Sequence, residues 1–167
     1  MSFARNQQTA AFLEQWERVL RWQGRVHGRS HASPDEFMDH LYALFQNCFA
    51  MRDWLENSEV IPGESLSEIF SAFELRLCRD ICNGTKHLEI TRPSVDANFM
   101  TVREYAPPPI SKLDEALSSP EYKLVLIAAD NKYDLVELAD QCVDILRNAL
   151  STRNLLSQKS NLKPLKF

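Results

Sequence analysis

Glycine is scarce in this sequence, with only four among 167 residues. Few glycines together with many helix-forming residues favour a mainly helical fold. Long apolar runs are also absent: none approaches the roughly 18 residues that a helix needs to cross a bilayer, so we expect no membrane association. The first residues, MSFARNQQTAAF, lack the apolar core of a secretory signal, which favours a cytoplasmic protein.

A large excess of charge of one sign is absent as well. The formal net charge is -4, which gives no overall electrostatic footprint for nucleic acid or anionic lipid. A local basic patch remains compatible with this value, because net charge says nothing about how the charges are distributed.

The cysteines do not form the pattern of a disulfide framework. Cys48, Cys78, Cys82 and Cys142 all lie within helical patterns, which fits small buried side chains in a reducing compartment. Cys78 and Cys82 are one helical turn apart, but no second pair of ligands follows at the spacing of a metal site. We therefore expect neither a bound metal nor another cofactor.

Hydrophobic periodicity divides the chain into four helical regions and one extended region. Apolar residues recur at helical spacing over about residues 9–24, 33–56, 62–84 and 133–154. Two strand-like stretches, NFMTVREY and EYKLVLIAAD, flank a triple proline between the third and fourth helices. We expect a mainly α fold: a four-helix bundle with a small β-hairpin insertion between the third and fourth helices. Residues 1–156 are predicted to form a single domain, followed by a polar tail at 157–167.

Local signals predict where individual helices begin and end. Ser33 followed by Pro34 is typical of a helix start, with serine as the N-cap. Gly84 is well placed to end the third helix, because glycine favours the C-terminal cap. Two histidines, His27 and His31, lie in the loop after the first helix, and we expect them to be solvated.

The stretch CRDICNGTKHLEI gathers polar side chains at the end of the third helix. At about 100° per residue, four of them span about 60° at the border of the apolar arc: Arg76, Asp80, Asn83 and His87. Arg79 and Lys86 lie further round, toward water. In the second helix, Arg52 falls within the apolar arc, where a guanidinium must reach solvent or a carboxylate. An Arg52–Asp80 contact would require crossing helices or a dimer.

Two interpretations of these polar residues remain open. In the first, Arg76 and Asp80 form an i, i+4 ion pair that contributes about 0.2–0.5 kcal/mol, and the rest is a solvated helix face. In the second, the residues form a site. His87 suits proton transfer near neutral pH, and a neighbouring arginine suits the charge of a phosphate in its transition state.

The helical pattern, combined with the motif from Arg79-Asp80 to His87, resembles the HEPN superfamily. Its members are often metal-independent ribonucleases of bacterial toxin–antitoxin and defence systems, and many dimerise around a shared cleft. Seven residues separate Arg79 from His87, a longer spacing than in the family pattern. The resemblance implies that this chain cleaves RNA as a cytoplasmic homodimer with a cognate protein partner.

The predicted site follows from that resemblance and from the polar stripe. The catalytic residues are expected to be Arg79, His87 and Asp80, and the substrate-binding residues Asn83, Lys86, Arg52 and Arg76. The alternative is a non-catalytic helical module that binds a partner or forms a homodimer scaffold. A metal-dependent hydrolase using Asp80 and His87 with Cys82 or His40 fits less well, because no second set of ligands is present at suitable spacing.

Overall fold

The computed structural model describes residues 2–28, 33–87, 90–105 and 122–157. Among them are five helices: α1 (Ser2–Val26), α2 (Pro34–Asn57), α3 (Gly63–Ile69), α4 (Phe73–Lys86) and α6 (Leu135–Ser151). Three strands, β1 (Met100–Tyr105), β2 (Tyr122–Ala128) and β3 (Asn131–Asp134), form an antiparallel sheet in that order. The expected mainly α fold is therefore confirmed. No helix in these ranges is long and apolar enough to span a membrane.

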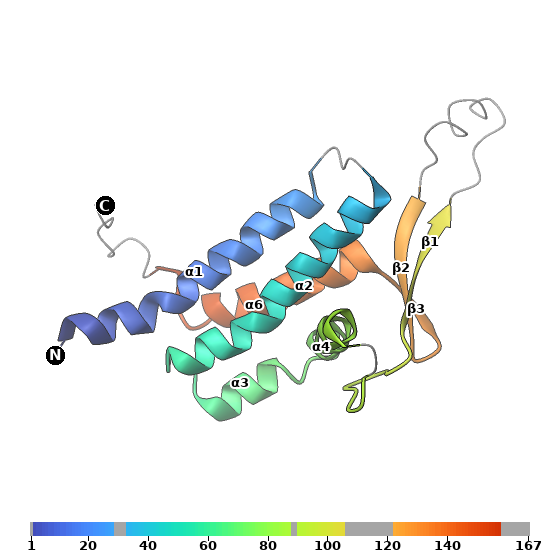
Figure 1. Cartoon of the computed structure of the whole chain (residues 1–167). Helices are drawn as coiled ribbons and strands as arrows, with labels where there is room; N and C mark the ends of the chain where they lie inside the picture. Colours follow the sequence, from blue (N-terminus) through green and yellow to red (C-terminus); the bar gives the residue numbers. More distant parts are fainter. Residues whose placement is uncertain (1, 29–32, 88–89, 106–121, 158–167) are drawn as a thin grey trace.

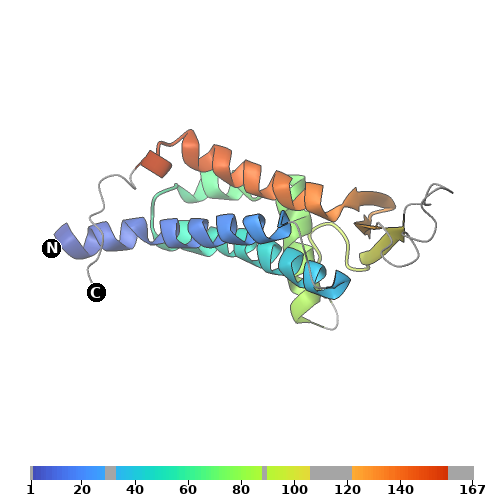
Figure 2. The ribbon, with the colours of Figure 1, turned by 90° about the horizontal axis from the view of Figure 1, so that it is seen from above.

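The helices do not form the expected four-helix bundle. Figures 1 and 2 show α1, α2 and α6 running along one another, while α4 runs across them and its C-terminal end projects past α2. The pattern over residues 62–84 is in fact two helices, α3 and α4, interrupted around Ser71. Apolar spacing continues unbroken through this interruption, from Leu66 by way of Phe70 to Phe73, so periodicity predicted one helix where the chain makes two.

The core lies between α1, α2, α4, α6 and one face of β2. Its fully buried side chains include Phe12, Phe45, Leu77, Leu126 and Leu146. All four cysteines are buried free thiols, as expected. Burial raises the pKa of Cys48 and of Cys78 above the ordinary thiol value, so both side chains stay protonated at neutral pH.

The ends of α2 and α4 show which local signals were reliable. The Ser33 hydroxyl accepts a hydrogen bond from the Glu36 N–H at 3.1 Å, which confirms the predicted N-cap. The predicted end at Gly84 is wrong, because α4 continues to Lys86. Gly84 instead permits close packing: a Cβ there would lie 2.5 Å from Cζ of Phe99 and 2.9 Å from its Cε1. The glycine lets the Phe99 ring rest directly on the helix.

The sheet contains one strand more than the expected hairpin. The strands β1 and β2 correspond to the two predicted stretches, whereas β3 occupies residues at which the last helix was expected to begin. The turn between β2 and β3 consists of Ala129 and Asp130, both at positive φ (46° and 61°). Such turns usually carry Asn-Gly or Asp-Gly, so this one had no sequence signal. The triple proline and the polar tail, apart from its first residue Ser157, lie in 106–121 and 158–167, outside the described residues.

Asp96 holds the β2–β3 turn from the connection between α4 and β1. Its Oδ2 accepts a hydrogen bond from the Ala129 N–H at 2.8 Å, and its Oδ1 accepts one from the Asn98 N–H at 2.8 Å. These two backbone donors lower the pKa of Asp96 below its ordinary value of 3.8. The charged carboxylate is therefore the form that the folded structure favours.

Replacing Gly84 by alanine should destabilise the protein by about 1–2 kcal/mol, because the new methyl group displaces the Phe99 ring. Gly24 is a matched control, since it lies in α1 and a Cβ added there would meet no atom within 4 Å. Gly24→Ala should stabilise by about 0.5–1 kcal/mol through helix propensity alone. Urea denaturation measures both. Equal effects of the two substitutions would mean that Phe99 does not rest on Gly84.

Asp96→Asn should lower the free energy of unfolding at pH 7 and have little effect at strongly acidic pH. The folded pKa lies below the unfolded one, so the stabilisation is present above the unfolded pKa and is lost as the pH falls through the folded pKa. Urea denaturation between pH 2 and pH 7 measures the difference, with Asp39→Asn on the exposed side of α2 as control. A difference from the wild type that stays constant over this range would contradict the assignment.

Candidate functional site

Asp80 is the most deeply buried charged residue of the predicted site. It lies on α4, is 0% exposed, and accepts hydrogen bonds from three consecutive backbone N–H groups. Oδ1 accepts from Ser94 at 2.7 Å, and Oδ2 accepts from Val95 at 2.6 Å and Asp96 at 3.0 Å. These bonds satisfy a carboxylate that would otherwise be costly to bury. The contacts of Asp80 are therefore structural ones.

Arg76 binds the same loop rather than Asp80. Its Nε donates to the Ser94 hydroxyl at 3.3 Å, and its Nη2 donates to the Ser94 carbonyl. The salt bridges among the described residues do not include an Arg76–Asp80 pair. The i, i+4 ion pair suggested by their spacing is therefore wrong: both side chains anchor the connection from α4 to β1.

The C-terminal half of α4 carries the remaining residues of the motif. Arg79 and Asn83 are half-buried, whereas Lys86 and His87 are exposed. His87 is the C-cap residue, and its backbone N–H donates to the Asn83 carbonyl at 2.9 Å. By helical geometry Arg79, Asn83 and Lys86 fall within an arc of about 60°, and His87 follows them as an extended residue directly after the helix. Within the described part of the chain, their side chains make no hydrogen bond or ion pair.

This arrangement leaves a basic surface at the projecting end of α4. We call it the α4 face and define it as Arg79, Asn83, Lys86 and His87. None of the four side chains is ion-paired with a carboxylate of the described residues, and the acidic side chain on the border of the face, Asp80, is buried under the loop. Cations near a helix C-terminus also interact favourably with the helix dipole, so the charges stabilise α4 whatever else they do.

Arg52 does not join this face. It is half-buried on α2, and its guanidinium carbon lies 6.0 Å from the centroid of the Phe70 ring. The Arg52–Asp80 contact is absent, because backbone N–H groups occupy both oxygens of Asp80. The arginine instead covers the residue that ends α3.

A shallow hollow of the described residues lies between α1 and α2. It measures about 250 Å³ and is lined by residues of α1, α2 and the residue after α2: Ala11, Asp53, Trp54, Asn57 and Ser58. None of the predicted site residues lines it. In the described ranges no group of three or more His, Cys, Asp or Glu side chains is arranged to hold a metal ion.

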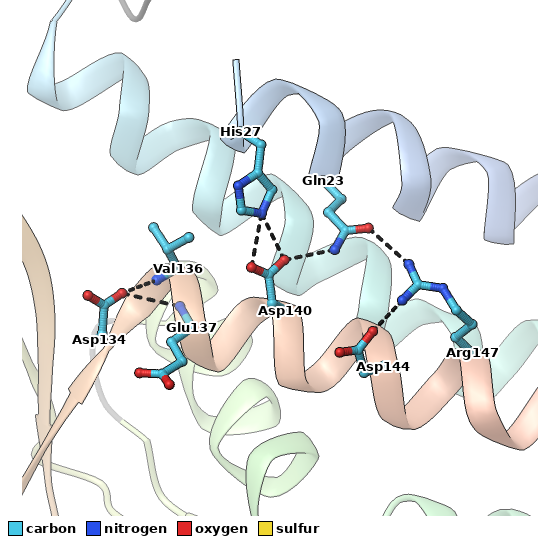
Figure 3. Close-up of polar contacts among 8 residues, drawn as sticks. All are labelled: Gln23, His27, Asp134, Val136, Glu137, Asp140, Asp144 and Arg147. Carbon is cyan, nitrogen blue, oxygen red and sulfur yellow. Dashed lines mark hydrogen bonds and ion pairs between the residues drawn. The ribbon is translucent and has the colours of Figure 1, made fainter. Parts of the chain in front are cut away.

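A second polar cluster, between α1 and α6, had no counterpart among the sequence-based expectations (Figure 3). Nε2 of His27 lies 2.9 Å from both carboxylate oxygens of Asp140, and Gln23 donates to Asp140 Oδ1 at 2.7 Å. Arg147 donates to Gln23 Oε1 at 3.3 Å and also pairs with Asp144. His27 is solvated as expected, with 49% of its side chain exposed, but its pairing with Asp140 was not predicted. His31 lies outside the described residues.

This second cluster ties two helices together. Its members come from residues more than one hundred positions apart, so no local pattern in the sequence could have paired them. The hydrogen bonds of Gln23 in α1 and of His27, the residue after α1, reach side chains of α6 and help to hold the two helices together.

Comparison of the chain with protein-family models, with curated proteins and with solved structures finds no match.

Asp80→Asn should destabilise the protein by about 2–3 kcal/mol, because an amide offers one acceptor oxygen where the carboxylate offers two. At least one backbone N–H of the 94–96 segment would then face an NH₂ group. Asp53→Asn, an exposed change on α2, is the control and should alter stability by less than about 0.5 kcal/mol. Thermal and urea denaturation measure both variants. Equal free energies of unfolding for Asp80→Asn and Asp53→Asn would show that the Asp80 carboxylate does not hold the 94–96 segment.

Proposed function

We propose that the protein acts on RNA through the α4 face, as a HEPN-like ribonuclease that needs no metal. The observation that carries this proposal is the grouping of two half-buried residues, Arg79 and Asn83, with two exposed ones, Lys86 and His87, at one helix end, where none of them is ion-paired with a carboxylate of the described residues. A basic surface of this kind attracts phosphate, and the imidazole of a histidine within it is a group that can accept a proton.

Cleavage of RNA without a metal requires little from the protein, because the substrate supplies its own nucleophile. In the proposed reaction His87 accepts the proton of a 2′-hydroxyl, and the 2′-oxygen attacks the adjacent phosphorus. The bond from phosphorus to the 5′-oxygen breaks, which leaves a 2′,3′-cyclic phosphate, and the departing 5′-oxygen takes up a proton from water. Arg79 stabilises the negative charge that accumulates on the phosphate oxygens. Asn83 and Lys86 hold the flanking backbone.

The proposal assigns Asp80 no contact with the substrate, since its carboxylate is fully enclosed. Arg76 is likewise engaged with Ser94. Arg52 as a substrate-binding residue stays a prediction, and it would require the RNA to extend from α4 to the end of α3.

The proposal includes a homodimer, a cognate protein partner and a cytoplasmic location. The end of α4 that carries the α4 face projects past α2 (Figure 2), so a second copy of the chain packed beside this end would form a cleft with it. RNA cleavage by an unregulated enzyme is toxic, which is the reason to expect a partner. A cytoplasmic location also suits four thiols that remain free.

A non-catalytic interaction module is the second candidate. It is favoured by the contacts of Asp80 and Arg76, because these two predicted site residues are occupied in holding the loop. Under this alternative the α4 face binds an anionic partner without cleaving it.

The two candidates separate in a cleavage assay on end-labelled single-stranded RNA in the presence of EDTA. The ribonuclease proposal expects cleavage by the wild type and a loss of about 10²–10⁴-fold in His87→Ala. Arg79→Ala should also lose most activity. Arg21→Ala, which removes an exposed cation from α1, is the control and should retain it.

Cleavage that survives both His87→Ala and Arg79→Ala would refute the proposed chemistry. Binding of RNA without cleavage by the wild type, weakened by Arg79→Ala, would support the interaction module instead. Absence of both binding and cleavage would remove RNA as the substrate altogether. Circular dichroism of each variant confirms that the helices remain folded.

A further inference from the structure

We propose that Asp80 and Arg76 are positioning residues that fix His87 relative to Arg79 by tying the connection between α4 and β1 onto α4. The inference rests on the proposed function, because it concerns the geometry of the α4 face. It goes further by giving two residues of the predicted site a role that involves no contact with the substrate.

The first tie is the carboxylate of Asp80. Three successive backbone N–H groups, from Ser94 to Asp96, point at its two oxygens with distances of 2.6–3.0 Å. Hydrogen bonds to a charged acceptor are stronger than those between neutral groups, and burial strengthens them further. Because Asp80 is 0% exposed, the loop backbone rather than a ligand occupies it.

Arg76 holds Ser94 from the other side. Its guanidinium donates to the carbonyl and to the hydroxyl of Ser94, while Asp80 accepts from the N–H of the same residue. Every polar group of Ser94 is thus engaged by α4. An arginine can do this because its donors lie in a rigid plane, whereas a lysine offers a single point of charge.

The connection also touches α4 one turn nearer its end. The Phe99 ring and Cδ1 of Ile90 both lie against Gly84, the latter 3.5 Å from where a Cβ would stand. His87 therefore lies between two anchored points, the last turn of α4 and Ile90. Displacement of the 94–96 segment would shift Ile90 and Phe99 on the helix, and with them the start of the connection at His87.

The tie continues into the sheet through Asp96. Its N–H donates to Asp80, and its carboxylate accepts from the N–H of Ala129 in the β2–β3 turn. A single residue thus links the buried carboxylate of α4 with the tip of the hairpin. A substitution at Asp96 should consequently change the position of His87. This is expected even though the Asp96 carboxylate accepts its hydrogen bond from the β2–β3 turn and not from α4.

The test compares Arg76→Gln, Arg76→Lys and Arg79→Gln with the control Arg21→Gln. The nuclear magnetic resonance signals of the His87 ring and of the Ser94–Asp96 amides are measured first, without RNA. Arg76→Gln should shift the His87 ring signals, Arg76→Lys should shift them less, and Arg21→Gln should leave them unchanged. His87 signals that do not move in Arg76→Gln would overturn the positioning role.

The second measurement is RNA binding and cleavage as a function of salt. Removing one phosphate contact to single-stranded RNA lowers the slope of log K against log salt by about 0.7, which is expected of Arg79→Gln. Arg76→Gln should keep the wild-type slope and KM, while kcat falls by about 10–100-fold through misplacement of His87. A slope lowered in Arg76→Gln as in Arg79→Gln would identify Arg76 as a phosphate-binding residue and overturn the proposal.

The two proposals fail separately. If the wild type neither binds nor cleaves RNA, the proposed function is wrong, while the His87 signals still decide whether Arg76 positions that residue. Asp96→Asn gives an independent variant that leaves α4 intact: it should shift the His87 signals in the same direction as Arg76→Gln. If the His87 signals are unchanged in both Arg76→Gln and Asp96→Asn, the connection between α4 and β1 does not determine the position of His87.

Discussion

The structure around α4 depends on one buried charge, the carboxylate of Asp80. A carboxylate without solvent is stable only when its oxygens are fully bonded, and here three backbone N–H groups supply those bonds. Because the donors belong to consecutive residues, satisfying the charge also fixes the path of the chain. The loop in turn holds the hairpin turn through Asp96. The need to bond one carboxylate thus links the helical layer to the sheet.

The elements that the sequence predicted well are those with local causes. Amphipathic spacing located α1, α2, α4 and α6, and the serine hydroxyl located the start of α2. The break between α3 and α4 was invisible because the apolar stripe continues across it. The strand β3 was invisible because its turn uses Ala129 and Asp130 at positive φ rather than Asn-Gly or Asp-Gly. At the turn, a tertiary contact prevails over local preference, because the Asp96 carboxylate accepts from the Ala129 N–H.

In the candidate site, too, features with local causes were predicted and features that depend on distant contacts were not. The sequence identified Arg76, Asp80 and His87 as unusual, and spacing along a helix suggested that the first two meet each other. Their actual partner, Ser94, lies beyond the helix end, where no periodicity applies. The pairing of His27 with Asp140 spans most of the chain and depends on how α1 packs against α6. The local sequence showed which polar residues were unusual. Which residue each of them contacts could be learned only from the three-dimensional structure.

The distribution of the cysteines has a chemical consequence. All four thiols lie inside the helical layers, and the two whose pKa is raised by burial remain protonated. Since alkylating reagents attack the thiolate, the native protein presents an outer surface that is inert to them wherever it is described. A cysteine introduced on that surface would accept a fluorophore or a spin label alone, without removal of the natural ones. The rate at which the natural thiols react would then report the rate at which the core opens.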